Sequence, residues 1–261
     1  MKNKKMWEVF AVVCVLAMTI GVTLPASAQM SEVKEKPPMY SYVSSWAVPR
    51  AQWAEMDKAD AADEPMFEKA LASGALVGYG RDVNLVHQPD GYTSDEWFSA
   101  MSMGALVSVL EGLYKSGSPV TPVLSAATKH EDGMFESRYY NWHSGSWKNG
   151  YTHVSSYKLK ADAPDEAVGM LSKNFIAPLL EKLVADGTLH EYEIDTEAIH
   201  TQSPGTFWIV YIAASPEGLD KVNAALEAAL KASPFAGPAF GSMVDFTPHR
   251  DQLARTNGTF K

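Results

Sequence analysis

The chain has 261 residues, with 22 lysines and arginines against 31 aspartates and glutamates, which gives a formal net charge of −9. This acidic balance repels phosphate backbones, and no basic run interleaved with aromatic residues occurs, so nucleic acid is excluded as an expected partner. The single cysteine, Cys14, lies near the N-terminus, so an intrachain disulfide is excluded as well.

Residues 1–28 have the pattern of a secretory signal peptide. A basic start, MKNKK, precedes the apolar run VFAVVCVLAMTIGV, and the small residues Ala26 and Ala28 lie just before Gln29. Cleavage after Ala28 predicts a periplasmic or secreted protein with no membrane attachment, whereas the alternative is an uncleaved anchor of about 20 apolar residues. The polar residues 29–38, QMSEVKEKPP, predict a flexible leader.

After the leader, the chain presents one pattern of elements twice. YVSSWAV (residues 42–48) is matched by HVSSYKL (residues 153–159), and both phrases are typical of strands. A helical segment follows each strand and is predicted to stop at a glycine, Gly74 in the first half and Gly187 in the second.

The second strands of the two halves are related by a constant spacing. GYGRDVNLVH in the first half is matched by EYEIDTEAIH in the second, and three residue types recur 113 positions apart: Tyr79 and Tyr192, Asp82 and Asp195, His87 and His200. A turn, a third strand, a helix and a fourth strand follow in both halves, the fourth strands being ESRYYNWHSG and GSMVDFTPHR. The order is strand, helix, strand, strand, helix, strand, twice.

That order is the split βαβ arrangement of the ferredoxin-like fold. On this order and the matched phrases, residues 40–250 resemble the dimeric α/β-barrel superfamily, which includes antibiotic-biosynthesis monooxygenases, EthD-like and NIPSNAP-like proteins and haem-binding chlorite dismutases. The resemblance implies an α+β fold in which a ferredoxin-like βαββαβ unit is duplicated in tandem, and the two sheets pack as an intrachain α/β barrel. It implies a first unit at residues 39–146, a second at 147–250 and a C-terminal tail at 251–261.

Such a barrel would hold its site between the sheets, and alternation along the strands suggests which side chains line it. The candidate ligand-binding residues are aromatic or imidazole side chains that share one face of their strands: Tyr79, His87, Tyr192, His200, Trp46 and Tyr157. Asp82 and Asp195 are predicted to point the other way. The same composition also suits a duplicated core. A histidine before a turn most often caps loop carbonyls or faces water, and the alternatives are a substrate contact and, less often, a metal or haem ligand.

Motifs for other chemistries are absent. The sequence has no GxSxG, no HExxH and no phosphate-binding glycine loop, so no cofactor is expected. The glycines of VGYGRD predict a bulge or a close neighbour instead. The nearest acidic and imidazole group, around His87 and Asp90, lacks a recognised metal-ligand spacing, so no metal is expected. HEDG, at residues 130–133, is interpreted as a surface loop.

These observations favour an exported protein that binds a small apolar or aromatic ligand between two ferredoxin-like sheets. One alternative is a cofactor-free monooxygenase-like enzyme, in which a histidine takes a proton from a phenolic or enolic substrate. Another is a haem-binding protein. The fold hosts unrelated chemistries, so whether the protein is an enzyme stays open, and a monomer and a homodimer are equally compatible with the sequence.

Overall fold

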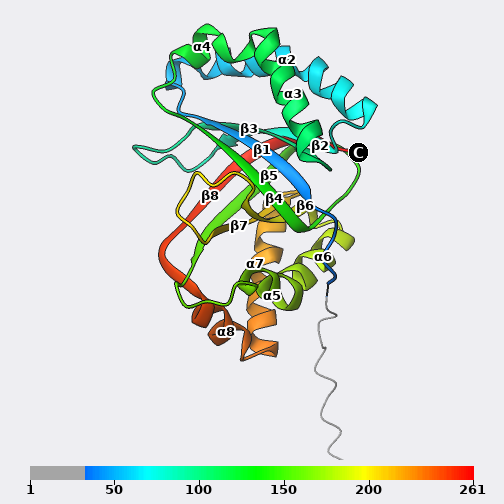
Figure 1. Cartoon of the computed structure of the whole chain (residues 1–261), viewed down its shortest axis with the longest axis vertical. Helices are drawn as coiled ribbons and strands as arrows, with labels where there is room; N and C mark the ends of the chain where they lie inside the picture. The colour runs from blue at the N-terminus through cyan, green and yellow to red at the C-terminus, as the bar shows by residue number, and fades with distance from the viewer. Residues whose placement is uncertain (1–32) are drawn as a thin grey trace, which may run out of the picture.

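The duplicated order predicted from the sequence is present in the structure, a computed structural model that describes residues 33–261 (Figure 1). Both halves run strand, helix, strand, strand, helix, strand. The main elements of the first half are β1 (Met39–Trp46), α2 (Trp53–Ser73), β2 (Gly78–Asn84), β3 (Ser94–Ala100), α3 (Met103–Ser116) and β4 (His130–Trp142). Its short helical turns are η1 (Arg50–Gln52), η2 (Ser118–Val120) and α4 (Pro122–Ser125).

The second half differs mainly in its first helical segment, which contains a π-helical turn. Its strands are β5 (Gly145–Leu159), β6 (Leu189–Glu197), β7 (Thr206–Ala213) and β8 (Val244–Phe260). Its helical elements are α5 (Ala167–Leu171), the π-helical η3 (Ser172–Ile176), α6 (Ala177–Ala185), α7 (Pro216–Ala232) and α8 (Ala236–Met243).

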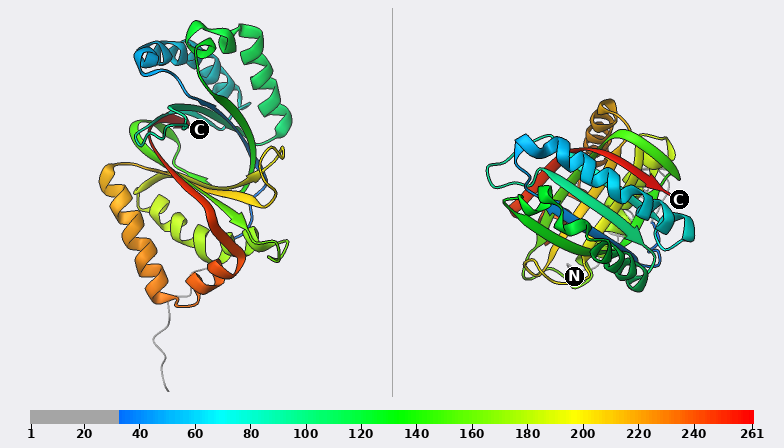
Figure 2. Two further views of the ribbon diagram at one scale, coloured as in Figure 1. Left: turned by 90° about the vertical axis from the view of Figure 1, so that its left-hand side faces the viewer. Right: turned by 90° about the horizontal axis from the view of Figure 1, so that it is seen from above.

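The eight strands form one closed antiparallel barrel in the order β1-β3-β2-β8-β5-β7-β6-β4. Within it, β4-β1-β3-β2 and β8-β5-β7-β6 have the same order, which is that of a ferredoxin-like unit. The pairs β2 with β8 and β6 with β4 join the units, so neither sheet keeps a free edge. Helices lie outside the barrel, α2 to α4 on one side and α5 to α8 on the other (Figure 2). The predicted fold class is confirmed.

Local sequence sets the ends of the helices. The Ser102 hydroxyl accepts a hydrogen bond from the Ala105 backbone N–H at 3.2 Å and so caps the start of α3. Gly74 and Gly187 have φ values of 79° and 77°, so both predicted glycine stops are confirmed. No helix within residues 33–261 is long and apolar enough to span a membrane.

Two hydrophobic cores lie between the outer face of the barrel and the helices. In the first half, Phe67 of α2 and Leu106 of α3 pack on Tyr79 and Phe98 of the strands. In the second half, α6 and α7 cover Tyr192 with its neighbours on β6 and β7. Apolar outward-facing residues in these two cores are therefore buried under helices, and the inward faces of the strands line the barrel.

The prediction of a C-terminal tail at residues 251–261 is wrong. β8 continues to Phe260 and pairs with β2 on one side and with β5 on the other. The sequence does not predict this strand because the stretch DQLARTNG is polar and its hydrophobic alternation is weak. The strand forms because its backbone is paired on both sides. The second unit therefore extends from β5 to the end of β8.

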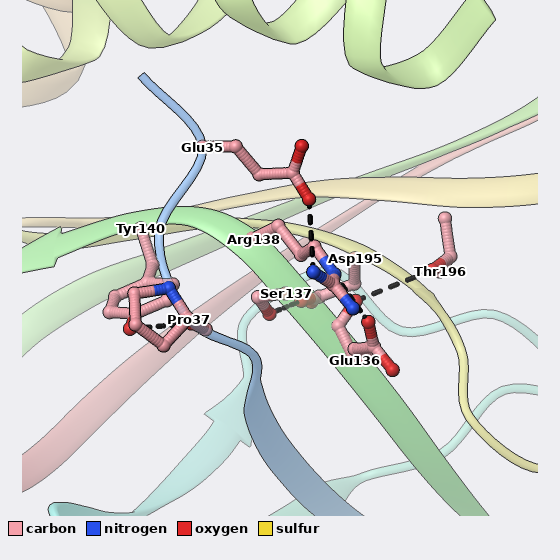
Figure 3. A network of polar contacts seen from close by, with 8 residues as sticks. All are labelled: Glu35, Pro37, Glu136, Ser137, Arg138, Tyr140, Asp195 and Thr196. Atoms are coloured by element: carbon pink, nitrogen blue, oxygen red, sulfur yellow. Dashed lines mark hydrogen bonds and ion pairs between the residues drawn. The ribbon is translucent and has the colours of Figure 1, made fainter. Parts of the chain in front are cut away.

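The flexible leader predicted at residues 29–38 is held in place where it is described. The backbone N–H of Lys36 donates to the carbonyl of Arg138 on β4 at 2.9 Å, and the Lys36 ammonium lies 3.6 Å from a Glu181 carboxylate oxygen. Glu35 pairs with the Arg138 guanidinium at 3.0 Å (Figure 3). The predicted signal peptide, with its cleavage after Ala28, lies outside the described residues.

Phe260, at the end of β8, joins the two units through its side chain. Its ring is 2% exposed and lies 5.5, 5.0 and 5.8 Å, between ring centroids, from Trp97, Trp142 and Trp147. These tryptophans come from β3, β4 and β5, so one side chain connects strands of both halves.

We expect Phe260→Ala to lower the free energy of unfolding by about 3–5 kcal/mol, because it leaves a cavity among three indoles. Phe235→Ala is the matched control, since Phe235 is 82% exposed and its loss should change stability by less than about 0.5 kcal/mol. Urea unfolding followed by tryptophan fluorescence measures both changes. Equal effects of the two substitutions would contradict the role given to Phe260.

Candidate functional site

The barrel encloses a cavity of about 210 Å³ lined by side chains from all eight strands. Part of its wall is apolar and aromatic, formed by Val43, Trp97, Phe135, Val154, Trp208, Val210 and Ile212. Phe135 and Trp208 meet edge to face, with ring centroids 4.9 Å apart and an interplanar angle of 72°. The cavity therefore lies between the two sheets, where the resemblance to barrel proteins predicts a site.

The two ends of the cavity differ. At one end, Trp97 and Ile212 line the cavity and pack with Phe260, Trp142 and Trp147, and we call this cluster the aromatic floor. At the other end lie the loops that follow β2 and β6, where Tyr92 and Gln202 both donate hydrogen bonds to the carboxylate of Glu131. Glu131 belongs to β4, so HEDG, predicted as a surface loop, is instead the start of a strand at this mouth.

The other part of the wall carries carboxyl groups. Five of them, four buried and Glu193 half-buried, are called the interior carboxyls: Asp82, Asp95, Glu191, Glu193 and Asp195. Asp82 and Asp95 oppose each other on β2 and β3. Thr152 donates to Asp82 Oδ1 at 3.0 Å, and Gln252 donates to Asp95 Oδ2 at 2.6 Å. Burial and the neighbouring Asp95 carboxylate raise the pKa of Asp82 to about 7, and burial also raises the pKa of Asp95.

The remaining interior carboxyls lie on alternate positions of β6, running from the aromatic floor toward the mouth. Ser41 donates to Glu193 Oε2 at 3.2 Å, and Ser137 donates to Asp195 (Figure 3). Burial raises the pKa of Glu193 to about 7, and burial with repulsion from Glu193 raises the pKa of Asp195 well above its ordinary value.

Glu191 is the deepest of the β6 carboxyls, opposite Trp142 and Ile212 in the strand register. Its side chain is 3% exposed, and it forms no hydrogen bond with any residue that the structure describes. Burial raises the pKa of Glu191 well above its ordinary value, and the charges of Glu193, Asp195 and Asp82 raise it further.

No cation balances these groups from within the wall. Among the described residues that line the cavity there is no lysine, arginine or histidine. Arg81, next to Asp82 in sequence, points outward, where its guanidinium lies 3.8 Å from Asp60 and 3.6 Å from Glu96. Over residues 33–261, no group of three or more His, Cys, Asp and Glu side chains has a geometry suited to a metal ion.

The candidate residues predicted from the sequence lie elsewhere. Tyr79 stacks on Phe67 of α2, with ring centroids 5.3 Å apart, and the Tyr192 hydroxyl donates to Glu181 of α6 at 2.8 Å. Both tyrosines therefore belong to the outer cores beneath the helices. The predicted facing of the second strands is wrong, since Asp82 and Asp195 point into the barrel and the tyrosines point out of it.

The other four candidates are also outside the cavity, and the structure does not bring the six together. Trp46 stacks on His130 with ring centroids 3.5 Å apart. Tyr157 packs between Phe207 and His249 on the outer side of β5. His87 is exposed and stacks on Trp53, and His200 is exposed in the loop after β6.

The error has a simple physical cause. Side chains alternate between the two faces of a strand. Assigning the wrong face to one residue therefore assigns the wrong face to all residues of that strand. The aromatic face is predicted to line the pocket and the face with Asp82 and Asp195 to point away from it. Here the helices bury the aromatic face, and closure of the barrel buries the acidic one.

Sequence reasoning missed Glu191 and Glu193, although a signal for them exists. In EYEIDTE, acidic residues occupy every second position, which places four carboxyls on one face of a single strand. Such a ladder is typical of a solvated face. Only the closed barrel shows that this face is interior.

No protein-family model matches the sequence, and no curated protein matches it. The fold is shared with solved structures. A candidate monooxygenase from Lactobacillus acidophilus has a TM-score of 0.61 at 12% identity, over 85% of this chain and 94% of that chain. A candidate monooxygenase from Fusobacterium nucleatum has a TM-score of 0.61 at 8% identity, over 87% and 95%.

An anthrone oxidase-like protein is similar at a TM-score of 0.52 and 10% identity, over 85% of this chain and 92% of that chain. At identities this low, the likeness shows a common fold and does not extend to chemistry. The chain has the fold of a dimeric α/β barrel, with both halves supplied by one polypeptide.

Proposed function

We propose that this protein binds a small molecule inside its barrel. The observation that carries the proposal is the cavity of about 210 Å³, which has an aromatic floor, an apolar wall and buried carboxyls on the remaining wall. An engineered cavity of about 150 Å³ in another protein is large enough for benzene. The ligand is therefore about the size of one aromatic ring with a short substituent. This ligand would lie between the two sheets, as the sequence predicts, but it would contact other residues than the six predicted candidates.

We further propose that binding takes place outside the cytoplasm. The support is the pattern of residues 1–28, with its basic start, apolar run and small residues before Gln29. N-terminal sequencing of the protein from its own host tests this, and a mature chain that begins at Gln29 is the expected result.

A second candidate function is the cofactor-free oxidation of a phenolic or enolic substrate. It is favoured by the interior carboxyls whose pKa lies at about 7, Asp82 and Glu193, because a base with a pKa near the working pH is well matched to proton abstraction. Three solved structures with this fold are described as candidate monooxygenases or anthrone oxidase-like. In this function a carboxylate, and not a histidine, takes the proton.

Filling the cavity tests the binding proposal. We expect Val210→Phe to weaken binding of single-ring aromatic compounds by about tenfold or more, because the added ring occupies the ligand's space. Val107→Phe on the exposed side of α3 is the matched control and should leave binding unchanged. Isothermal titration calorimetry with a cationic, a neutral and an anionic compound gives the affinities. Equal binding by the two variants would place the ligand elsewhere.

Oxygen consumption tests the second candidate. With a single-ring phenol such as hydroquinone as substrate, an enzyme of this kind consumes oxygen at a rate that rises as the pH passes through about 7, because the base must be ionised. We expect Glu193→Gln to lower that rate by about a hundredfold or more. An oxygen electrode measures both rates. Absence of uptake by the folded parent protein would eliminate this function and leave the binding proposal standing.

The raised pKa of Asp82 predicts how stability depends on pH. The ordinary pKa is 3.8 and the folded value is about 7, so the folded chain binds this proton more tightly than the unfolded chain does. The stability from this proton is fully present below about pH 4 and is lost as the pH rises through about 7. We expect Asp82→Asn to reduce the loss of unfolding free energy between pH 5 and pH 8 by on the order of 2–4 kcal/mol.

Urea unfolding at the two pH values measures that difference. Asp162→Asn, in an exposed turn, is the control and should keep the parent's dependence on pH. The same loss of stability in the parent and in Asp82→Asn would show that Asp82 is ionised in the folded protein at pH 5.

A further inference from the structure

The cavity wall is strongly biased toward one sign of charge. Both units contribute interior carboxyls, from β2 and β3 on one side and from β6 on the other, and no basic side chain lines the described wall. A bound cation favours the ionised form of these carboxyls and is attracted to it, whereas a bound anion is repelled by every carboxylate and favours the protonated form. Among ligands small enough for the cavity, the acidic wall therefore favours cations over anions.

The deepest interior carboxyl also lacks a partner. Serine, threonine and glutamine side chains donate to Asp82, Asp95, Glu193 and Asp195, as described above. Glu191 is 3% exposed and lines the cavity, and it has no hydrogen-bond donor among residues 33–261. A buried carboxyl without a donor is costly, and a ligand N–H group at this point would remove that cost.

The walls around these carboxyls are suited to the rest of such a ligand. Trp208 pairs directly with Asp195 across β6 and β7, and Phe135 lies against Trp208. Trp97 approaches from the opposite sheet. Indole and phenyl faces attract organic cations and also pack against an aromatic ring, so they suit both parts of an arylalkyl ammonium ion.

We propose that the ligand is a small organic cation, a primary ammonium carrying one aromatic ring, and that Glu191 accepts its N–H groups at the aromatic floor. This inference rests on the proposed function and names its ligand class. The ammonium lies beside Glu191 and Glu193, and the ring extends toward Trp208 and Phe135. Glu191 is a binding residue in this arrangement and needs no role in catalysis.

Protons are exchanged when the cation binds. The groups that face Glu191 are Glu193 and Asp195 on its own strand and Asp82 from the opposite sheet, and all are acidic. Without a ligand, their mutual repulsion favours protonated carboxyls. A bound ammonium favours the ionised form, so binding releases protons to the buffer.

The experiment compares three probes that are close in shape and differ in charge: the phenethylammonium ion, 2-phenylethanol and phenylacetate. Titration calorimetry of the full-length protein at pH 7 gives the affinities, and repeating it in buffers of different ionisation enthalpy counts the protons released. We expect phenethylammonium to bind about ten- to a hundredfold more tightly than the alcohol and to release protons, and phenylacetate to bind most weakly.

Glu191→Gln tests the anchor. We expect this variant to lose about ten- to a hundredfold in affinity for phenethylammonium and to keep its affinity for 2-phenylethanol within about twofold. Glu136→Gln is the matched control, because Glu136 lies on the outer side of β4, where it pairs with Arg138 at 2.7 Å (Figure 3). It should bind all three probes as the parent protein does. Circular dichroism confirms that each variant is folded.

The outcomes separate the two proposals. If the alcohol binds as tightly as the ammonium, or if Glu191→Gln binds the ammonium as the parent does, the ligand class is overturned and binding in the barrel stands. If none of the three probes binds to the folded parent protein, the proposed function fails and the ligand class fails with it.

Discussion

Closure of the barrel by β8 is the constraint on which the rest of the structure depends. This strand pairs with β5 of the second unit along its length and with β2 of the first unit over Ala254–Phe260, and the β4–β6 pair closes the opposite seam. An isolated ferredoxin-like sheet has helices on one face and must cover the other. Here each sheet covers the inner face of the other. The outer face packs in the two helix-covered cores, and the inner face surrounds a space that helices never enter.

That inner face is where the sequence departs from ordinary core composition. Burying a carboxyl is unfavourable unless it is protonated or receives hydrogen bonds, and the barrel shows both responses. Ser41, Ser137, Thr152 and Gln252 donate to four of the interior carboxyls, and burial raises the pKa of every one. A barrel needing only stability would fill this space with aliphatic side chains. Binding of a ligand in the cavity, as proposed above, would explain why the wall keeps these carboxyls.

The sequence predicts the architecture well because the same order of elements, with matched residues, occurs in both halves of the chain. Tyr79 with Tyr192 and Asp82 with Asp195 reveal the repeat without any knowledge of tertiary structure, and Gly74 and Gly187 mark the helix ends by local backbone preference. The site depends on which face of each strand is interior, and local sequence does not specify that. The alternation of residues around a tyrosine is the same whether its side chain packs under a helix or lines a pocket. The length of β8 was missed for a related reason: its pairing is made by backbone groups, and its side chains are mostly polar.

The two halves also differ in their inward-facing residues, and this difference makes the cavity asymmetric. In the repeat, Glu191 and Glu193 of β6 correspond to Gly78 and Gly80 of β2. A Cβ atom at Gly78 would overlap the ring of Phe260, and one at Gly80 would overlap the indole of Trp97, so glycine is required at both positions. The prediction of a close neighbour at these glycines is confirmed. Duplication alone would produce two equivalent strands. At these two inward positions, however, β2 has glycines that leave room for the rings of Phe260 and Trp97, whereas β6 has carboxyl side chains. Because the floor closes one end and Glu191 lies next to it, the proposed cationic ligand enters at the mouth and points its charged end toward Glu191.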